Sequence, residues 1–208
     1  MLPPDFFNCD AQELAKKLLG KVLRVKHGRH WLSAQIIETE AYYLEDKASH
    51  ASLGFTEKRQ ALFMPAGTIY MYYARGGDSL NISAEGDGNA VLIKSAYPFG
   101  DEAMLSIMQQ LNPAANQKGI RRREKLCGGQ TLLCKSLGLK VPDWNQKQFD
   151  PKRFYLADFG YTPENIIQTA RLGIPLGRDE HLPYRFIDAA YVKYCTKNYA
   201  NTTLKKEY

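Results

Sequence analysis

Glu38, Glu40 and Tyr42 alternate along one short apolar segment, residues 36–42. Side chains on a β-strand point alternately to its two faces, so these three would share one face. A carboxylate placed this way can take a proton from an attacking water and stabilise positive charge developing on a substrate. An edge strand with incidental acids facing solvent gives the same pattern, and periodicity alone favours that simpler interpretation.

Two aromatic features follow this strand. His50 lies in a stretch without a helix or strand pattern. The predicted strand over residues 68–74 contains three tyrosines, Tyr70, Tyr72 and Tyr73. A lone loop histidine is usually structural or solvated, and tyrosines on a strand are usually part of the core. Aromatic rings near basic residues are also what a stacking pocket for a nucleobase requires.

The chain has 28 Lys and Arg against 22 Asp and Glu, which gives a net charge of +6. This balance favours a polyanionic partner without proving one. The basic residues form one dense block: Lys118, Arg121, Arg122, Arg123 and Lys125. A second series consists of Arg171, Arg178 and Arg185, for which a solvated face is the expectation.

The four cysteines fit neither a disulfide framework nor a zinc pattern, and buried thiols are expected. Cys127 and Cys134 are expected on one face of a helix. We expect no metal and no other cofactor. No apolar stretch approaches the ~18 residues that cross a bilayer, and the N-terminus lacks signal-peptide features. These features predict a cytoplasmic protein without a membrane partner.

The elements that would position these side chains follow from capping residues, alternation and turn signals. Asp10 is an expected N-cap and Gly20 an expected helix end. Further helices are expected over 101–110 and 125–137, and an exposed excursion over 140–152. Strands are expected over 21–26, 31–42, 68–74, 80–83, 90–96, 154–157, 166–171 and 184–186. We predict an α+β fold: a single compact domain over 1–208 with a curved mixed or antiparallel sheet surrounded by α-helices, and frayed tails at 1–9 and 199–208.

Six blocks of the sequence resemble the alkyladenine (methylpurine) DNA glycosylase family and occur in the family's order over about residues 10–190. They are Glu38–Tyr42; His50; Met64–Tyr72; Asn81–Ser83 with Gly86–Lys94; Leu126–Cys134; and Arg171–Ile174 with Arg185–Phe186. The resemblance implies a monofunctional base-excision repair enzyme. It would flip an alkylated or deaminated purine out of double-stranded DNA and hydrolyse its N-glycosidic bond, acting as a monomer.

The resemblance also implies roles for individual residues. Glu40 would activate the attacking water, which Lys94 and the backbone carbonyl of Leu172 would help to hold. The base-binding pocket would comprise Tyr42 and His50 on either side of the flipped base, Tyr72 and Ala48 along the walls, and Asn81 at the floor. Asn81 would reject guanine by clashing with its exocyclic amino group. Arg121, Arg122 and Arg123 are the candidates for contacting the DNA backbone.

Two positions depart from the family pattern. The family has a DNA-intercalating tyrosine between the Tyr72 strand and Asn81, where this chain is one residue shorter and offers Tyr73 or Arg75. Wedges are normally bulky and mostly apolar. Lys94 stands in place of an arginine. A lysine with a lowered pKa could itself attack as an amine, although the resemblance implies a water nucleophile.

Three functions are consistent with the sequence. The glycosylase is the main prediction, and a non-catalytic binder of damaged DNA is the alternative that the altered wedge suggests. A small-molecule hydrolase or transferase with a related fold is the third. The preference among 3-methyladenine, hypoxanthine and ethenoadenine stays open.

Overall fold

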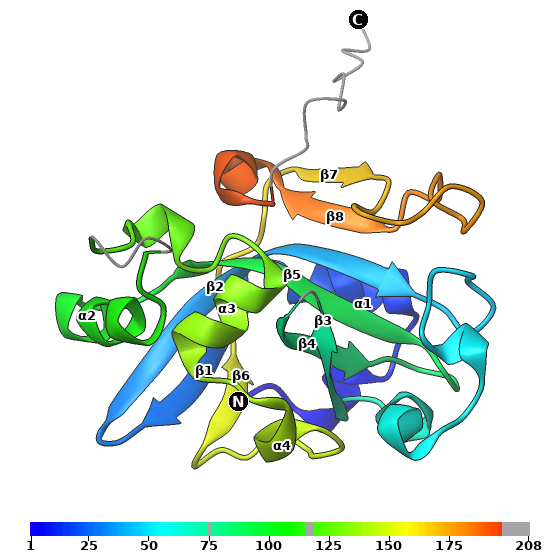
Figure 1. The fold of residues 1–208 in the computed structure, drawn as a ribbon, viewed down its shortest axis with the longest axis horizontal. Coiled ribbons are helices and arrows are strands. Elements are labelled where there is room, and N and C mark those ends of the chain that lie inside the picture. Colours follow the sequence, from blue (N-terminus) through cyan, green and yellow to red (C-terminus); the bar gives the residue numbers. More distant parts are fainter. Residues whose placement is uncertain (75, 115–118, 197–208) are drawn as a thin grey trace, which may run out of the picture.

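The computed structural model describes residues 1–74, 76–114 and 119–196, within which eight strands form one sheet (Figure 1). The strands are β1 (Val22–His27), β2 (His30–Tyr42), β3 (Ile69–Ala74), β4 (Gly77–Ser83), β5 (Ala90–Pro98), β6 (Phe154–Ala157), β7 (Ile166–Thr169) and β8 (Arg185–Asp188). Their order is β3-β4-β5-β2-β1-β6, and β8 joins β2 to β7. Every pairing between these strands is antiparallel, which confirms the α+β prediction and excludes a mixed sheet in the described region.

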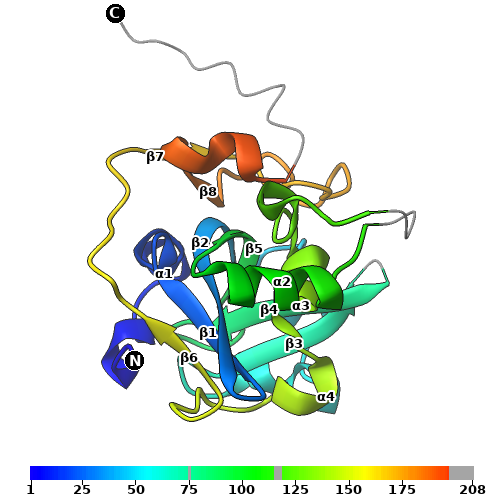
Figure 2. The ribbon, with the colours of Figure 1, turned by 90° about the vertical axis from the view of Figure 1, so that its left-hand side faces the viewer.

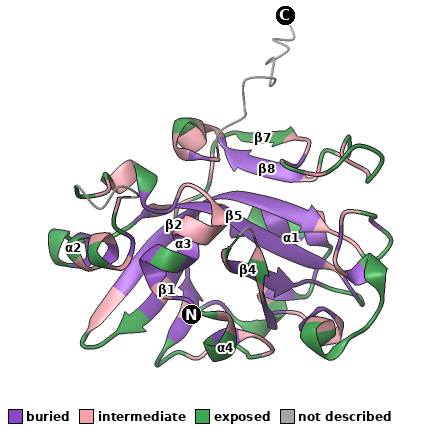
Figure 3. Ribbon diagram, viewed as in Figure 1, coloured by how far each residue is buried: buried purple, intermediate pink, exposed green. Residues whose placement is uncertain are grey.

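β2 is the central strand and is long enough to pair with three other strands. β5 pairs along one of its edges, while β1 and then β8 share the other edge. Figure 3 shows β2 and β5 buried along most of their length. The pairing of β2 with β5 shifts register on both sides of Glu38, so that Glu38 is opposite Ser95 while Thr39 is opposite Ile93. This irregularity leaves Lys94 as an extra residue, and such bulges re-aim side chains next to functional sites.

In the described parts of the chain, four α-helices pack on this sheet. They are α1 (Ala11–Leu18), α2 (Glu102–Leu111), α3 (Gln130–Leu137) and the short α4 (Val141–Trp144). Asp10 and Asp101 cap α1 and α2 by accepting backbone N–H bonds, as the sequence of α1 predicted. α1 packs on β2 and β5, α3 packs on β4 and β5, and Figure 2 shows α2 lying beside α3.

The main core fills one face of the sheet. Alternate residues of β3, β4 and β5 point into it with α1 and α3: Ile69, Met71, Leu80, Ile82, Val91 and Ile93. By the same alternation, the residues between them face the other side of the sheet. Those residues include Tyr70, Tyr72, Asn81 and Leu92.

Three expectations from the sequence were wrong. Residues 1–9 are not frayed, because Leu2 and Phe7 are buried and Phe7 stacks on Phe149. The third helix begins at Gln130, so Cys127 precedes it and does not share a helix face with Cys134. Both thiols are nevertheless buried. The segment 140–152 is anchored, since Trp144 is buried and Lys147 bridges to Ile69. The expected tail at 199–208 lies outside the described residues.

Candidate active site

A cavity of about 320 Å³ opens on the face of the sheet opposite the main core. This volume is at the lower end of the range for small-molecule sites, roughly 300–1,000 Å³. Seven of the residues selected from the sequence line it: Tyr42, Ala48, His50, Tyr72, Asn81, Lys94 and Leu172. Tyr73, one of the two wedge candidates, lies at its edge. Residues separated by more than a hundred positions in the chain therefore meet around one concave site.

The Glu40 carboxylate lies behind three of these lining residues and is 0% exposed. The Tyr42 hydroxyl donates to its Oε2 at 2.8 Å, and the Leu172 backbone N–H donates to Oε1 at 3.2 Å. The Lys94 Nζ is 3.2 Å from Oε1 and 3.3 Å from Oε2. A buried carboxylate is tolerated when an ion pair and hydrogen bonds compensate its lost hydration. The role predicted for Leu172 concerns its carbonyl and a water, and its contact with Glu40 is made by its N–H.

Tyr42 is held as a hydrogen-bond donor to Glu40. Burial, followed by the neighbouring Glu40 charge, raises the pKa of the Tyr42 phenol well above its usual range. The phenol thus keeps its proton at any physiological pH. Its ring meanwhile forms part of the cavity wall. One side chain therefore orients the carboxylate and presents an aromatic surface.

His50 forms part of the wall contributed by the loop after β2. Its Nδ1 is 2.9 Å from the Tyr70 hydroxyl, and its ring centroid is 4.3 Å from that of Tyr72. Burial, together with the charges of Arg59 and Arg178, lowers the pKa of His50. The imidazole is therefore neutral near pH 7 and is available as a flat ring rather than a cation. Tyr70, the partner that orients this ring, was not among the site residues predicted from the sequence.

Asn81 reaches the cavity from β4. Its Nδ2 donates to the Tyr70 carbonyl oxygen at 3.2 Å, a bond between paired strands that fixes the side-chain amide. The side chain is buried and lines the cavity. An amide held in this way gives a fixed polar group beside the aromatic residues of the cavity.

Glu38, the other acid on the strand, has a different environment. Arg185 approaches its Oε1 at 2.6 Å, and the Ser95 hydroxyl and Thr196 N–H donate to its Oε2 at 2.5 Å and 3.0 Å. Neither glutamate is among the lining residues, but the partners of Glu40 line the cavity and these partners of Glu38 do not. The two glutamates of the strand are thus separated into a structural ion pair and a carboxylate at the cavity.

The wedge and backbone candidates are placed only in part. Tyr73 is 66% exposed near the end of the β3–β4 hairpin, and Arg75 lies outside the described residues. Arg121 donates to the carbonyl oxygens of Asn112 and Pro113, and Arg123 donates to that of Pro98. These guanidinium groups therefore attach their segment to the end of α2 and to the end of β5. Arg122 is exposed.

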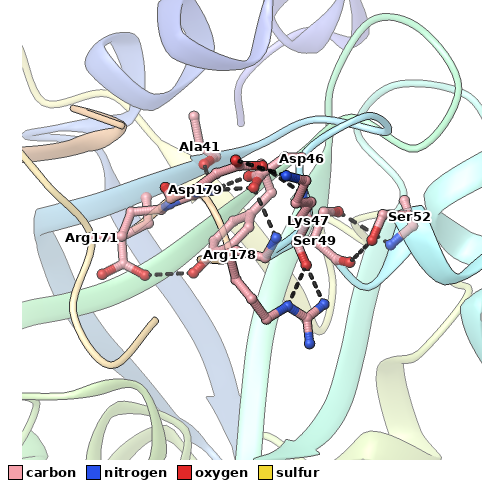
Figure 4. Close-up of polar contacts among 12 residues, drawn as sticks. Ala41, Asp46, Lys47, Ser49, Ser52, Arg171, Arg178 and Asp179 are labelled. Atoms are coloured by element: carbon pink, nitrogen blue, oxygen red, sulfur yellow. Dashed lines mark hydrogen bonds and ion pairs between the residues drawn. The ribbon is translucent and has the colours of Figure 1, made fainter. Parts of the chain in front are cut away.

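Two arginines expected on a solvated face are instead buried. Arg171 is 4% exposed and pairs with Asp46, and Arg185 is 1% exposed and pairs with Glu38. Of that series only Arg178 is exposed, and it donates to the Lys47 carbonyl oxygen (Figure 4). Gln130, at the start of α3, also lines the cavity and was not identified from the sequence.

The described residues contain no group of three or more His, Cys, Asp or Glu side chains placed to hold a metal ion. Over the same ranges, no helix has the length and apolar character needed to span a membrane. The cavity itself presents a lysine, hydroxyl groups and aromatic rings, with the buried carboxylate of Glu40 behind them.

Comparisons with known proteins give a family and several relatives for this chain. The family model for methylpurine-DNA glycosylase (MPG) matches residues 5–191. A protein of Pseudomonas savastanoi pv. phaseolicola is 64% identical over 201 residues, covering 95% of this chain and 90% of its own length. A protein of Pseudomonas aeruginosa is 61% identical, with 95% and 84% covered, and one of Koribacter versatilis is 32% identical, with 90% and 89% covered. All three carry the name "putative 3-methyladenine DNA glycosylase". The chain belongs to the methylpurine-DNA glycosylase family and is, with that family, a DNA repair hydrolase acting on N-glycosyl bonds.

Proposed function

We propose that this protein removes alkylated or deaminated purines, such as 3-methyladenine and hypoxanthine, from double-stranded DNA. The target nucleotide is flipped into the cavity, and a water activated by Glu40 attacks its sugar. The observation that carries this proposal is the Glu40 carboxylate held by Tyr42, Lys94 and Leu172 directly behind an aromatic cavity.

The binding step follows from the walls of the cavity. Extruding a base costs a few kcal/mol, and costs least when the base is damaged or mispaired. Stacking on aromatic rings returns about 1–3 kcal/mol per base. Tyr42 and His50, from two separate segments, would flank the base, and the fixed amide of Asn81 would face its edge. A cationic base such as 3-methyladenine gains further from attraction to the tyrosine rings, by about 0.5–2 kcal/mol.

The chemical step follows from the contacts of Glu40. As the glycosidic bond breaks, positive charge develops on the sugar, and the carboxylate stabilises it and accepts the proton of the water. A general base contributes about 10²–10⁴-fold. The Lys94 Nζ lies within ion-pair distance of both carboxylate oxygens and donates to Glu40, so it is engaged as the partner of the carboxylate. This contact supports a water nucleophile over an amine.

Tyr73 is our candidate for the side chain that fills the gap left in the duplex. Its ring is bulky and exposed at the edge of the cavity. Side chains that intercalate between base steps are normally bulky and mostly apolar.

The test is base release from a panel of duplexes, each with one 3-methyladenine analogue, hypoxanthine or ethenoadenine. Free base is quantified by mass spectrometry, and the same tubes are examined on denaturing gels before and after alkali. We expect free base with an intact strand until alkali is added. Tight binding without release would show a non-catalytic damage-binding protein, and nicking before alkali would show attack by an amine.

A further inference from the structure

We propose that Arg171, through its pair with Asp46, is a positioning residue that joins the two walls of the cavity and fixes Tyr42 for the reaction of Glu40. This inference rests on the proposed function, since it concerns the same site. Arg171 does not line the cavity, so it acts through the groups that it holds rather than on the substrate.

The first wall is the loop after β2, which Asp46 organises. Asp46 Oδ1 accepts from the Ala48 N–H at 2.9 Å, and its backbone carbonyl accepts from the Ser49 N–H at 2.8 Å. Ala48, Ser49 and His50 all line the cavity. The Asp46 side chain thus sets the start of the turn that presents this wall.

The second wall is the segment after Arg171. Leu172 donates its N–H to Glu40, and Leu172, Gly173 and Ile174 line the cavity. Arg171 attaches this segment to β2, because its Nη1 donates to the Ala41 carbonyl oxygen at 3.0 Å. Ala41 is the residue between Glu40 and Tyr42. Figure 4 shows Arg171, Asp46 and Ala41 joined by these contacts.

The guanidinium group also contacts the Tyr42 ring. Its Cζ lies 4.5 Å from the centroid of Tyr42 and 5.3 Å from that of Tyr184. Arg171 Nη1 and Nη2 both bind the Asp46 carboxylate, with the Nη2 contact at 3.0 Å. A planar fork can pair with a carboxylate, bind a carbonyl and stack on rings at once, whereas a lysine ammonium is a compact point charge. The structure therefore requires arginine at this position.

Two conservative variants separate positioning from simple loss of a buried ion pair. Arg171→Lys and Arg185→Lys each keep the charge and lose the fork, and each affects a buried pair near β2. Arg185 holds Glu38, which does not line the cavity. Single-turnover base release is measured with saturating enzyme at a temperature where both variants are folded, and affinity is measured on a duplex with an abasic site.

We expect Arg171→Lys to lower the single-turnover rate by about 10- to 100-fold, because a misplacement near 1 Å can cost about 100-fold. Affinity for the abasic-site duplex should stay within about threefold, since surface contacts to DNA are unchanged. Arg185→Lys should lower the midpoint of thermal unfolding and leave the rate within about threefold. Asp46→Asn should reproduce the Arg171→Lys loss, and the double variant should lose no more than either alone, because coupled partners are not additive.

A wild-type rate in Arg171→Lys would overturn the proposal, as would an equal loss of rate in Arg185→Lys, because any buried pair would then matter alike. Additive losses in the double variant would also overturn it. Failure of the proposed function gives a different result, in which the wild-type protein releases no base from any lesion.

Discussion

Replacing Glu40 with glutamine removes the proton acceptor while keeping the size of the side chain. The carboxylate accepts from Tyr42 at Oε2, from the Leu172 N–H at Oε1, and contacts Lys94 with both oxygens. A glutamine has only one oxygen, so its NH₂ group must face either the Leu172 N–H or the Tyr42 hydroxyl. Glu40→Gln thus tests chemistry with little change in cavity shape.

Glu40→Gln is expected to lose most of the catalytic rate and still to fold. Losing a general base costs about 10²–10⁴-fold in rate. At 1.36 kcal/mol per tenfold, this is about 2.7–5.4 kcal/mol of transition-state stabilisation. Glu40→Gln also removes the carboxylate partner of the buried Lys94 side chain, and breaking a buried ion pair in this way lowers the free energy of unfolding by about 3–5 kcal/mol. Domains are stable by about 5–15 kcal/mol, so the variant should still fold.

The assay is single-turnover release of hypoxanthine from a duplex, with binding to an abasic-site duplex measured in parallel. Glu38→Gln is the matched control, because Glu38 is on the same strand, is equally buried and binds Arg185 instead of the cavity residues. It should lose stability by a similar amount and keep its rate within about threefold.

Two results would refute this reasoning. If Glu40→Gln releases base at a rate within about threefold of wild type, Glu40 is not the general base. If Glu38→Gln loses rate to the same extent as Glu40→Gln, both effects come from damage to β2 and not from chemistry.

Three further predictions concern the surroundings of the cavity. Tyr73→Ala should leave the midpoint of urea unfolding almost unchanged, because Tyr73 is largely exposed. The same variant should slow base release from duplex DNA by about tenfold or more, and should slow release from single-stranded DNA less. Burial lowers the pKa of His50 below its ordinary 6.5, so the unfolded chain binds more protons than the folded chain just below that pH. The free energy of unfolding should therefore fall as the pH drops through this window. In urea titrations, His50→Gln should make the free energy of unfolding less dependent on pH over the same range. Arg122→Ala should reduce the slope of log binding constant against log salt by about 0.9, the value for one phosphate contact, and an unchanged slope would remove Arg122 from the DNA interface.

Local patterns in the sequence were sufficient for much of the fold. The alternation over residues 36–42 correctly predicted a strand, because side-chain period is a property of the backbone and needs no partner. The Asp10 cap of α1 was predicted for the same reason, since a cap bonds to residues two and three positions away. The third helix was predicted to begin at residue 125 but begins at Gln130, because Gly129 before it has a φ of +126°, which is not a helical conformation.

The sequence by itself determined the chemical groups of the site: an acid and a tyrosine on one strand face, with aromatic residues in two later segments. Only the tertiary structure decided which groups meet. Lys94 is 54 residues from Glu40 in the chain, and the register of β5 on β2, with its bulge, brings the two together. Leu172 is 132 residues from Glu40, and it reaches Glu40 because the segment after β7 folds back over this strand. Arg171 and Arg185 show the same limit, because an arginine becomes a buried structural residue only where folding covers it and supplies a carboxylate.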